Sequence, residues 1–215
     1  MNLDRLINLK VENDLKGLDM EGEAERFSKL ASRKENGTAP AVVSAFNLFQ
    51  TPGEIAGRMA ALVAKHVGDG ARILEPSAGL GRLFAPLQAC LGAAADFVLV
   101  EESRDCCREL YRLTESAGNV ALKQGDFLQQ SRVSLGGEFD AVVMNPPFKM
   151  WRDIKHIKHA LSMLRPGGLL VALCANGPRQ NEELRPLADT WEVLPAGSFR
   201  SEGTGVSVAM LTIRA

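Results

Sequence analysis

The spacing of apolar positions divides the chain into two parts. Residues 1–45 mix acidic and basic side chains with scattered apolar ones, which reach helical spacing at Leu3 and Leu6. This pattern predicts an N-terminal extension of one or two surface helices that ends in a linker around 37–40. The apolar content rises sharply after the linker, so residues 46–215 are expected to form the main domain.

Strand-like and helix-like patterns alternate through this main domain. Short apolar runs predict strands, and apolar positions that recur every three to four residues predict helices. Strict alternation of the two indicates right-handed crossovers and a mainly parallel sheet with helices on both faces, which is a Rossmann-like α/β architecture. The strands are expected at 72–75, 96–101, 120–123, 139–144, 168–175, 191–194 and 206–213. The helices are expected at 82–91, 103–117, 152–164, 180–190, and over about 15 residues from Thr51 and Pro52, taken as N-cap and first helical residue.

The composition is that of an ordinary globular protein. Hydrophobic residues make up 46% and charged residues 24% of the 215 positions, which excludes a disordered chain and a coiled coil. The 25 basic and 26 acidic residues give a formal net charge of −1, so a polyanion would have to bind a local patch. No apolar run is long enough for a signal peptide or a membrane span, and a soluble cytoplasmic protein is expected.

The cysteines give no sign of a metal site. The chain has four, at Cys90, Cys106, Cys107 and Cys174, and none forms a Cys-x-x-Cys pair. They fall within predicted helices and a predicted strand. We therefore expect reduced, buried thiols rather than metal ligands.

A glycine-containing loop is predicted between the first strand and the next helix. It consists of Glu75, Pro76, Ser77, Ala78, Gly79, Leu80 and Gly81. Glycines at such a turn let the backbone approach a ligand closely, and the N–H groups of the following helix attract a carboxylate or phosphate. The spacing differs from the G-x-G-x-x-G dinucleotide pattern, and the preceding acid favours a cofactor that also carries positive charge. Taken alone, the loop could equally be a tight turn.

Two further predicted strands are followed by acidic residues. Glu101 ends the second strand, where a carboxylate can accept both hydroxyls of a ribose. Gly125, Asp126 and Phe127 follow the third strand and combine a hydrogen-bond acceptor with an aromatic face, which suits an adenine ring. Acids at strand ends are commonly only solvated. Three such features at the carboxyl edge of one sheet nevertheless favour a nucleotide-like ligand.

The fourth predicted strand runs into Asn145, Pro146, Pro147 and Phe148. The prolines hold the backbone extended and remove its donors, so the Pro146 carbonyl and the Asn145 amide oxygen can both accept hydrogens from one ligand amine. Phe148 then offers a ring on which a base could stack. The alternative is a Pro-Pro turn with Phe148 in the core.

Together these motifs resemble those of S-adenosylmethionine-dependent amino-methyltransferases, above all the gamma-order N6-adenine DNA methyltransferases. The resemblance covers residues 46–213 and rests on Thr51-Pro52, the loop at 75–81, Glu101, Gly125 to Phe127, the motif at 145–148, and Phe199 ahead of Gly203 and Thr204. It implies a class I methyltransferase fold with an antiparallel last strand. It also implies a cofactor pocket for S-adenosylmethionine lined by Thr51, Glu75, Ser77, Gly79, Glu101, Asp126 and Phe127, with Pro76, Ala78 and Gly81 of the same loop. The 145–148 motif would hold the target amine, and Phe199 would lie against the target base.

The chain departs from restriction-type relatives because it ends right after the last predicted strand, without their large target-recognition domain. The similarity is therefore closer to small methyltransferases of the phage or mobile-element type. Selection of a target sequence would fall to the N-terminal residues, the loops or a specificity-conferring protein partner.

The reaction implied by the resemblance needs neither a general base nor a metal. Two acceptors would localise the lone pair of an adenine N6 amine toward the methyl group of the sulfonium. The base would be flipped out of a duplex or come from a single strand, and Phe148 and Phe199 would stack on it. DNA is the main hypothesis for the substrate. The alternatives are an RNA base amine, at guanine N2 as in ribosomal RNA enzymes or at adenine N6, and a protein glutamine amide. A non-catalytic binding module is less consistent with two intact motifs.

A basic strip follows the 145–148 motif and consists of Lys149, Arg152, Lys155 and Lys158, with His156 and His159 among them. The buried face of the predicted helix would consist of Ile154, Ile157, Leu161 and Leu164, which leaves the strip outside. The strip is expected either to contact nucleic-acid phosphates or to be an ordinary solvated face. The two histidines have one acid nearby, Asp153, so they are not expected to bind a metal.

Overall fold

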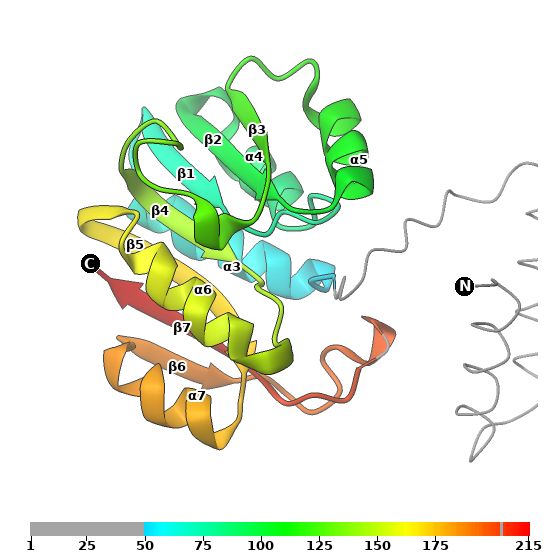
Figure 1. Cartoon of the computed structure of the whole chain (residues 1–215), viewed down its shortest axis with the longest axis vertical. Helices are drawn as coiled ribbons and strands as arrows, with labels where there is room; N and C mark the ends of the chain where they lie inside the picture. The colour runs from blue at the N-terminus through cyan, green and yellow to red at the C-terminus, as the bar shows by residue number, and fades with distance from the viewer. Residues whose placement is uncertain (1–49, 203) are drawn as a thin grey trace, which may run out of the picture. The chain divides into compact units, whose positions relative to one another are not determined.

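A seven-stranded sheet forms the centre of the part that the computed structural model describes, residues 50–202 and 204–215. The strand order is β3-β2-β1-β4-β5-β7-β6, and every neighbouring pair is parallel except the two that involve β7 (Figure 1). The predicted Rossmann-like sheet with an antiparallel last strand is therefore confirmed. The helices expected within 1–45 lie outside the described residues.

The bounds of the elements follow the predicted alternation. The strands are β1 (Ala71–Glu75), β2 (Ala95–Glu101), β3 (Val120–Gln124), β4 (Phe139–Met144), β5 (Leu164–Ala175), β6 (Thr190–Val193) and β7 (Val208–Arg214). The α-helices are α3 (Gly53–His66), α4 (Phe84–Leu91), α5 (Arg104–Thr114), α6 (Arg152–Leu161) and α7 (Pro178–Glu183). Short 3-10 helices are η1 (Gly92–Ala94), η2 (Phe127–Gln129), η3 (Lys149–Trp151), η4 (Arg185–Leu187) and η5 (Arg200–Glu202). None of the described helices is both long and apolar enough to cross a membrane.

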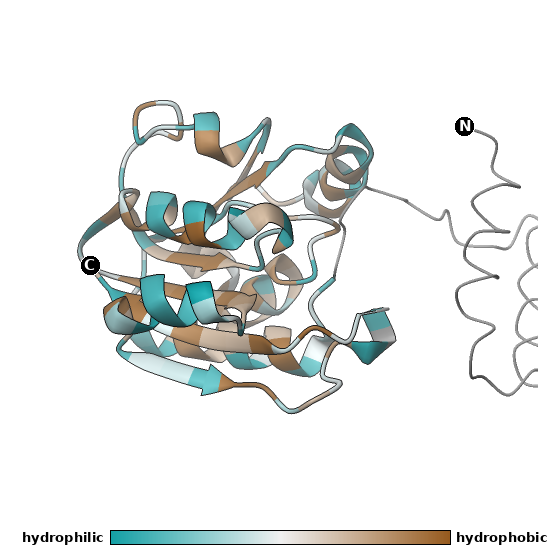
Figure 2. Ribbon diagram, turned by 60° about the horizontal axis from the view of Figure 1, so that its bottom comes forward, coloured by the Kyte–Doolittle hydropathy of each residue, from teal (hydrophilic) through white to brown (hydrophobic). Residues whose placement is uncertain are grey.

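Both faces of the sheet are apolar, because successive side chains of a strand point to opposite sides. Ile73 and Val143 pack in the core shared with α3, α4 and α5. Their sequence neighbours Leu74 and Val142 pack in a second core, which includes the buried side of α6. Figure 2 shows brown along the inner strands and teal on the outward turns of the helices. Helices cover both faces of the sheet, as predicted.

The order of the strands reverses between β1 and β4. From β1 the chain builds outward through β2 to β3, and then returns to place β4 on the other side of β1. Open α/β sheets bind ligands outside the carboxyl ends of the strands at such a switch point. The topology therefore directs attention to the loops that follow β1, β2, β3 and β4.

The first described helix does not begin with Thr51 as its N-cap. Pro52 is the capping residue, and its carbonyl oxygen accepts the backbone N–H of Ala56 at 2.9 Å. No side chain caps this helix. The prediction for Thr51 was wrong because its hydroxyl has a different partner, described with the site below.

Two predicted helices were too long because a proline lies within or just after the predicted range. α6 ends at Leu161 and β5 already begins at Leu164, since Pro166 disfavours helical backbone in the residue before it. Leu164 is therefore a strand residue and not part of the buried face of the helix. α7 ends at Glu183, and Pro186 lies in the separate turn η4.

All four cysteines are free thiols, and three of them are buried. Burial raises the pKa of Cys107 to about 11. Cys90 is exposed, so the expectation of a buried thiol was wrong there. It is one of the last residues of α4, where two consecutive positions face solvent.

Candidate active site

A cavity of about 610 Å³ opens where β1, β2, β3 and β4 end. It brings together motifs that lie far apart in the sequence. The predicted site residues that line it are Thr51, Glu75, Pro76, Ser77, Ala78, Gly79, Glu101, Asp126, Phe127, Asn145, Pro146, Pro147, Phe148 and Arg152. The carboxyl edge of the sheet is thus a single concave site, as the strand-end pattern indicated.

Several predicted site residues lie elsewhere. Gly81 has a φ of +76°, and a Cβ there would come within 2.7 Å of Leu113 Cδ2, so this glycine serves the turn and its close approach to α5. Phe199 is 2% exposed and packs in the core shared with α3, α4 and α5, because burial of a large apolar ring is favourable. This buried position does not agree with the prediction that Phe199 lies against the target base. The remaining members of the basic strip do not line the cavity; these are Lys149, Lys155 and Lys158.

The Glu101 carboxylate ties the glycine loop to the end of β2. Its Oε2 accepts a hydrogen bond from the backbone N–H of Gly79 at 2.8 Å, and its Oε1 accepts one from the N–H of Ser103 at 2.7 Å. Gly79 has a φ of 55°, which a glycine adopts without strain. One side chain therefore holds both the loop and the start of α5. Each carboxylate oxygen has a second lone pair that suits a ribose hydroxyl.

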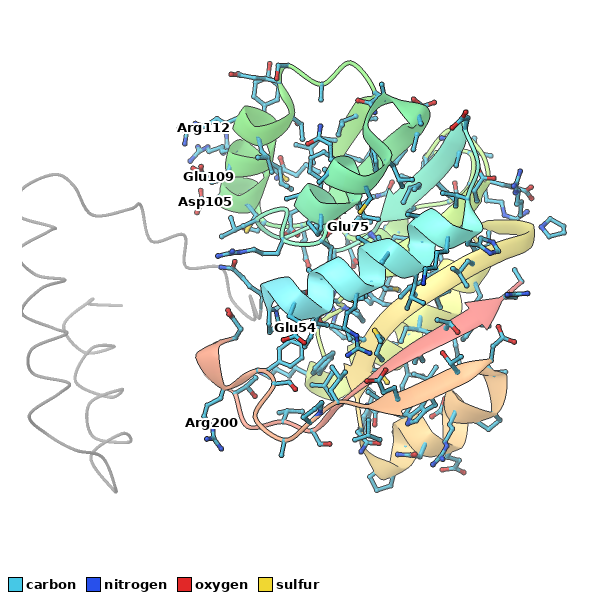
Figure 3. All side chains as sticks on the ribbon, turned by 180° about the vertical axis from the view of Figure 1, so that it is seen from behind. Glu54, Glu75, Asp105, Glu109, Arg112 and Arg200 are labelled. Atoms are coloured by element: carbon cyan, nitrogen blue, oxygen red, sulfur yellow. The ribbon has the colours of Figure 1, made fainter. Side chains whose placement is uncertain are left out.

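Glu75, at the end of β1, is the buried acid of the cavity. It is 2% exposed, and its Oε2 has no hydrogen-bond partner in the described structure. Figure 3 labels Glu75 in the interior, whereas Asp105, Glu109 and Arg112 project outward from α5. Burial, and after it the Glu101 carboxylate, raises the pKa of Glu75 well above its usual range. A ligand that brings a donor or a positive charge would stabilise this acid.

The charges around the cavity fit S-adenosylmethionine better than a dinucleotide. Carboxylates of Glu75, Glu101, Glu102 and Asp126 line it, against the guanidinium groups of Arg82 and Arg152. S-adenosylmethionine carries a sulfonium and an ammonium group, both positively charged. The pyrophosphate of a dinucleotide would face these acids unfavourably.

Asp126 and Phe127 differ in what they present to the cavity. Asp126 caps η2, where its Oδ1 accepts the backbone N–H of Leu128 at 3.0 Å, and it lies 3.7 Å from Arg152 Nη2. Phe127 is only 2% exposed, and its ring packs edge-on against His159 with the ring centroids 4.8 Å apart. The ring is therefore not the open stacking face that the sequence suggested, because α6 covers it.

Two acids from other elements oppose the basic strip, whereas its sequence neighbour Asp153 does not. Arg152 Nη2 lies 3.6 Å from Glu102, and Lys158 Nζ lies 2.8 Å from Glu183. Asp153 does not face the strip, because it is fully buried and accepts a hydrogen bond from the backbone N–H of Ala175. Burial raises the pKa of Asp153. Arg152 and Lys158 thus have their positive charges partly balanced.

The side-chain amide of Asn145 is oriented by Thr51. Its Nδ2 donates a hydrogen bond to the Thr51 hydroxyl at 3.1 Å, across 94 positions of sequence. In this orientation Nδ2 faces Thr51, and Oδ1 lies on the opposite side of the amide. Thr51 is 4% exposed, so the contact is shielded from water. Thr51 therefore acts on Asn145 rather than as a helix cap.

His156 lines the cavity, although the sequence pattern placed it on the outer face of the helix. It is 3% exposed, and neither of its ring nitrogens has a hydrogen-bond partner in the described structure. Burial, followed by the charge of Arg152, lowers the pKa of His156 to about 4. The ring is therefore neutral near pH 7. Within residues 50–202 and 204–215, no three His, Cys, Asp or Glu side chains gather as a metal site would require.

We expect His156→Leu to make the protein more resistant to acid. Between pH 6.5 and about 4 the folded protein binds fewer protons at His156 than the unfolded chain does, so the free energy of unfolding falls as the pH drops. At about 1.4 kcal/mol per unit of pKa, this loss is about 3 kcal/mol. Urea denaturation of both proteins at pH 7 and pH 4.5 measures it. An equal loss in the variant would assign the acid sensitivity to other groups.

Five polar lining residues were missed by the sequence reasoning, namely Gln50, Arg82, Glu102, Ser103 and His156. Glu102 and Ser103 directly follow Glu101, so their place after a strand end was a usable signal. His156 lies four residues after Arg152 on the same helix, which puts both side chains on one face. Gln50 and Arg82 carried no signal of this kind.

Comparisons with known proteins agree with the fold. No protein-family model matches the chain. The chain is similar to the rRNA N(6)-adenosine-methyltransferase metl-5 of Caenorhabditis elegans, with 26% identity over 177 residues, which cover 77% of this chain and 75% of the relative.

Solved structures show the same fold at low identity. A candidate RNA methyltransferase from Pyrococcus horikoshii, PH1948, matches with a TM-score of 0.65 and 16% identity over 85% of this chain and 98% of that one. TrmN from Thermus thermophilus matches with a TM-score of 0.60 and 18% identity over 75% of this chain, but only 48% of TrmN is covered. The N-methyltransferase NodS from Bradyrhizobium japonicum matches with a TM-score of 0.58 and 15% identity, over 75% and 94% of the two chains.

The fold, the charges of the cavity and these similarities are those of S-adenosylmethionine-dependent methyltransferases. The nucleic-acid substrates named among these relatives are RNA. They give no support to the DNA-specific family that the sequence motifs resemble.

Proposed function

We propose that this protein transfers a methyl group from S-adenosylmethionine to the N6 amine of an adenosine in RNA. The observation that carries the proposal is the hydrogen bond from Asn145 to Thr51, which holds the Asn145 amide at the cavity wall. An oriented amide oxygen beside a proline carbonyl suits an exocyclic base amine. The similarity to a worm rRNA adenosine methyltransferase supports RNA over DNA as the polymer.

The residues of the 145–148 motif would act on the lone pair of the amine. This lone pair is delocalised into the adenine ring, which makes the nitrogen a poor nucleophile. When Asn145 Oδ1 and the Pro146 carbonyl each accept one amine hydrogen, the nitrogen leaves the ring plane and its lone pair becomes available. The cofactor, when bound, supplies an electrophilic methyl group on a positively charged sulfur. Phe148 would stack on the base and hold the amine in line.

The acids at the other strand ends would bind the cofactor. Glu101 is placed to accept ribose hydroxyls, and Asp126 to accept an adenine amine. Glu75 would face a positively charged group, which gives its unpartnered oxygen a partner. The cavity thus separates cofactor contacts from the groups that act on the target amine.

The direct test is transfer of a tritiated methyl group from S-adenosylmethionine to RNA, DNA and a protein substrate in parallel. Label in RNA that digests to N6-methyladenosine is the expected result. Label confined to DNA would instead support DNA as the substrate, which was the main hypothesis from the sequence motifs. Label in N2-methylguanosine or glutamine would assign a different acceptor amine to the same site. The Asn145→Ala variant, purified in the same way, is the control for contaminating activity.

We expect Lys155→Gln to reduce the salt dependence of RNA binding. Lys155 is exposed on α6 and makes no ion pair with a described residue, whereas Lys158 is paired with Glu183. Loss of one phosphate contact to a single strand should flatten the slope of log K against log salt by about 0.7. Fluorescence anisotropy over a sodium chloride series measures the slope, and Lys158→Gln should change it less. An unaltered slope in Lys155→Gln would mean that this helix face is only solvated.

A further inference from the structure

The backbone directly after the 145–148 motif is strained. Met150 has φ 56° and ψ 35°, and Trp151 has φ 56° and ψ 28°. This left-handed conformation is unfavourable for residues with a Cβ. Among the described residues no other non-glycine residue has a positive φ. The strain persists because Phe148 on one side and α6 on the other are both packed against the core.

The strained turn places two large apolar side chains at the surface. Met150 is 76% exposed and Trp151 is 51% exposed. Trp151 lies between Phe148 and Arg152 in the chain, and both of these line the cavity. The backbone of Trp151 therefore adjoins the segment that forms the cavity wall.

Arg179 holds the exposed indole from a separate element. This residue belongs to the first turn of α7, and its guanidinium carbon lies 3.7 Å from the centroid of the Trp151 ring. A cation over the ring fixes its orientation while about half of the side chain stays exposed. Lys149 and Lys155 add positive charge on the flanking segments, so the surroundings are complementary to a phosphate backbone.

An oriented, half-exposed aromatic ring with cations beside it, in a segment that adjoins the cavity wall, is an arrangement that proteins use for unpaired nucleotides. Bases stack on such a ring, and the cations contact the backbone. A flipped or unpaired adenosine in the cavity brings its neighbouring nucleotide to the mouth. The sequence resemblance assigned base stacking to Phe199, but this residue is buried. Another aromatic side chain would therefore have to stack on the base.

We propose that Trp151, backed by Arg179, is the platform on which an unpaired base next to the target adenosine stacks. This inference rests on the proposed function and narrows its substrate to an adenosine in a single-stranded RNA segment. Trp151 is a positioning residue in this scheme, because it contacts the flanking base and not the reacting amine.

The chain offers a direct reporter, because it contains two tryptophans, Trp151 and Trp191. Trp191→Phe leaves Trp151 as the only source of indole fluorescence. The titrant is a short single-stranded RNA with one central adenosine, with S-adenosylhomocysteine present so that no transfer occurs. We expect saturable quenching by this RNA and weaker quenching by the same sequence in a duplex.

Affinity measurements in the otherwise unchanged chain complete the test. Trp151→Ala should raise the Kd for the single strand about tenfold, as loss of one stacked base does. Trp151→Phe should keep it within about threefold, and Arg179→Gln should raise it about two- to fivefold. Tyr111→Ala removes another exposed aromatic side chain, 64% exposed on α5, and should leave the Kd unchanged.

Two results would overturn the platform. One is the absence of quenching by either RNA. The other is an equal loss of affinity in Trp151→Ala and Trp151→Phe, which would indicate a local structural effect. These are binding measurements, so they are separate from methyl transfer. RNA methylation with no quenching refutes only the platform, and quenching by RNA with label only in DNA refutes the proposed function.

Discussion

Asn145→Ala is expected to lower kcat for methyl transfer about a hundred- to a thousandfold, the usual cost of removing one hydrogen-bonding group that acts in the transition state. The amide oxygen strengthens its contact with the amine as the new bond forms, so the loss appears in kcat more than in KM. The affinity for S-adenosylmethionine should change little, because the proposed cofactor contacts come from other strand ends. Steady-state kinetics together with calorimetry separates the two quantities.

Variants of Thr51 provide the matched control for this prediction. Thr51→Ser keeps a hydroxyl within reach of Asn145 Nδ2, whereas Thr51→Val has a similar shape and no acceptor. We expect Thr51→Val to lower kcat about tenfold and Thr51→Ser to lower it less. Full activity of Asn145→Ala would show that the motif only shapes the loop.

Glu75→Gln is expected to weaken S-adenosylmethionine binding about ten- to a hundredfold and to stabilise the protein without cofactor by about 1–3 kcal/mol. The raised pKa means that folded Glu75 holds its proton at pH values where the unfolded chain has lost it. The free energy of unfolding therefore falls as the pH rises above about 4.5 and through the folded pKa. Glutamine cannot ionise, so the variant should not show this fall.

Calorimetry and urea denaturation at pH 7 measure the two effects of Glu75→Gln. Glu102→Gln is the control, because Glu102 lines the same cavity but is largely exposed, and both effects should be small there. A variant of Glu75 that is less stable and binds the cofactor normally would contradict the prediction. That result would mean that the Glu75 carboxylate has a stabilising partner within the fold.

The architecture could be predicted because the apolar pattern of the central strands agrees with the burial of their side chains. Ile73 and Leu74 pack on opposite faces, so a strand covered on both sides appears in sequence as an unbroken apolar run. The polar residues just after such runs are then forced to one edge of the sheet. This is why the apolar pattern alone is enough to place Glu101 and Asn145 in the site.

The positions of aromatic rings were harder to predict, because a ring that serves a ligand and a ring that serves the core look alike in sequence. Phe127 and Phe199 both follow plausible site positions, yet neighbouring elements bury them. His156 was misplaced for the opposite reason, since a polar side chain was expected at the surface. These outcomes depend on contacts between distant segments, which spacing along one segment does not contain.

The choice between DNA and RNA lies outside what the motif encodes. In the proposed mechanism the residues at 145–148 act on an exocyclic amine, and that amine is the same in both polymers. The hydrogen bond that joins Thr51 to Asn145 was also hidden, because its two partners are 94 positions apart. The motif thus predicts a type of acceptor group and not the polymer that carries it.

Glu101 illustrates how a cofactor site can be preorganised by its own binding residue. The same carboxylate that would receive the ribose already pins the backbone of the glycine loop and the first residue of the turn into α5. The loop therefore has little conformational entropy left to lose when the cofactor arrives, which favours tight binding without a large rearrangement. It also means that substituting Glu101 would release two backbone segments together, and a weaker cofactor complex would then reflect lost rigidity as much as a lost ribose contact.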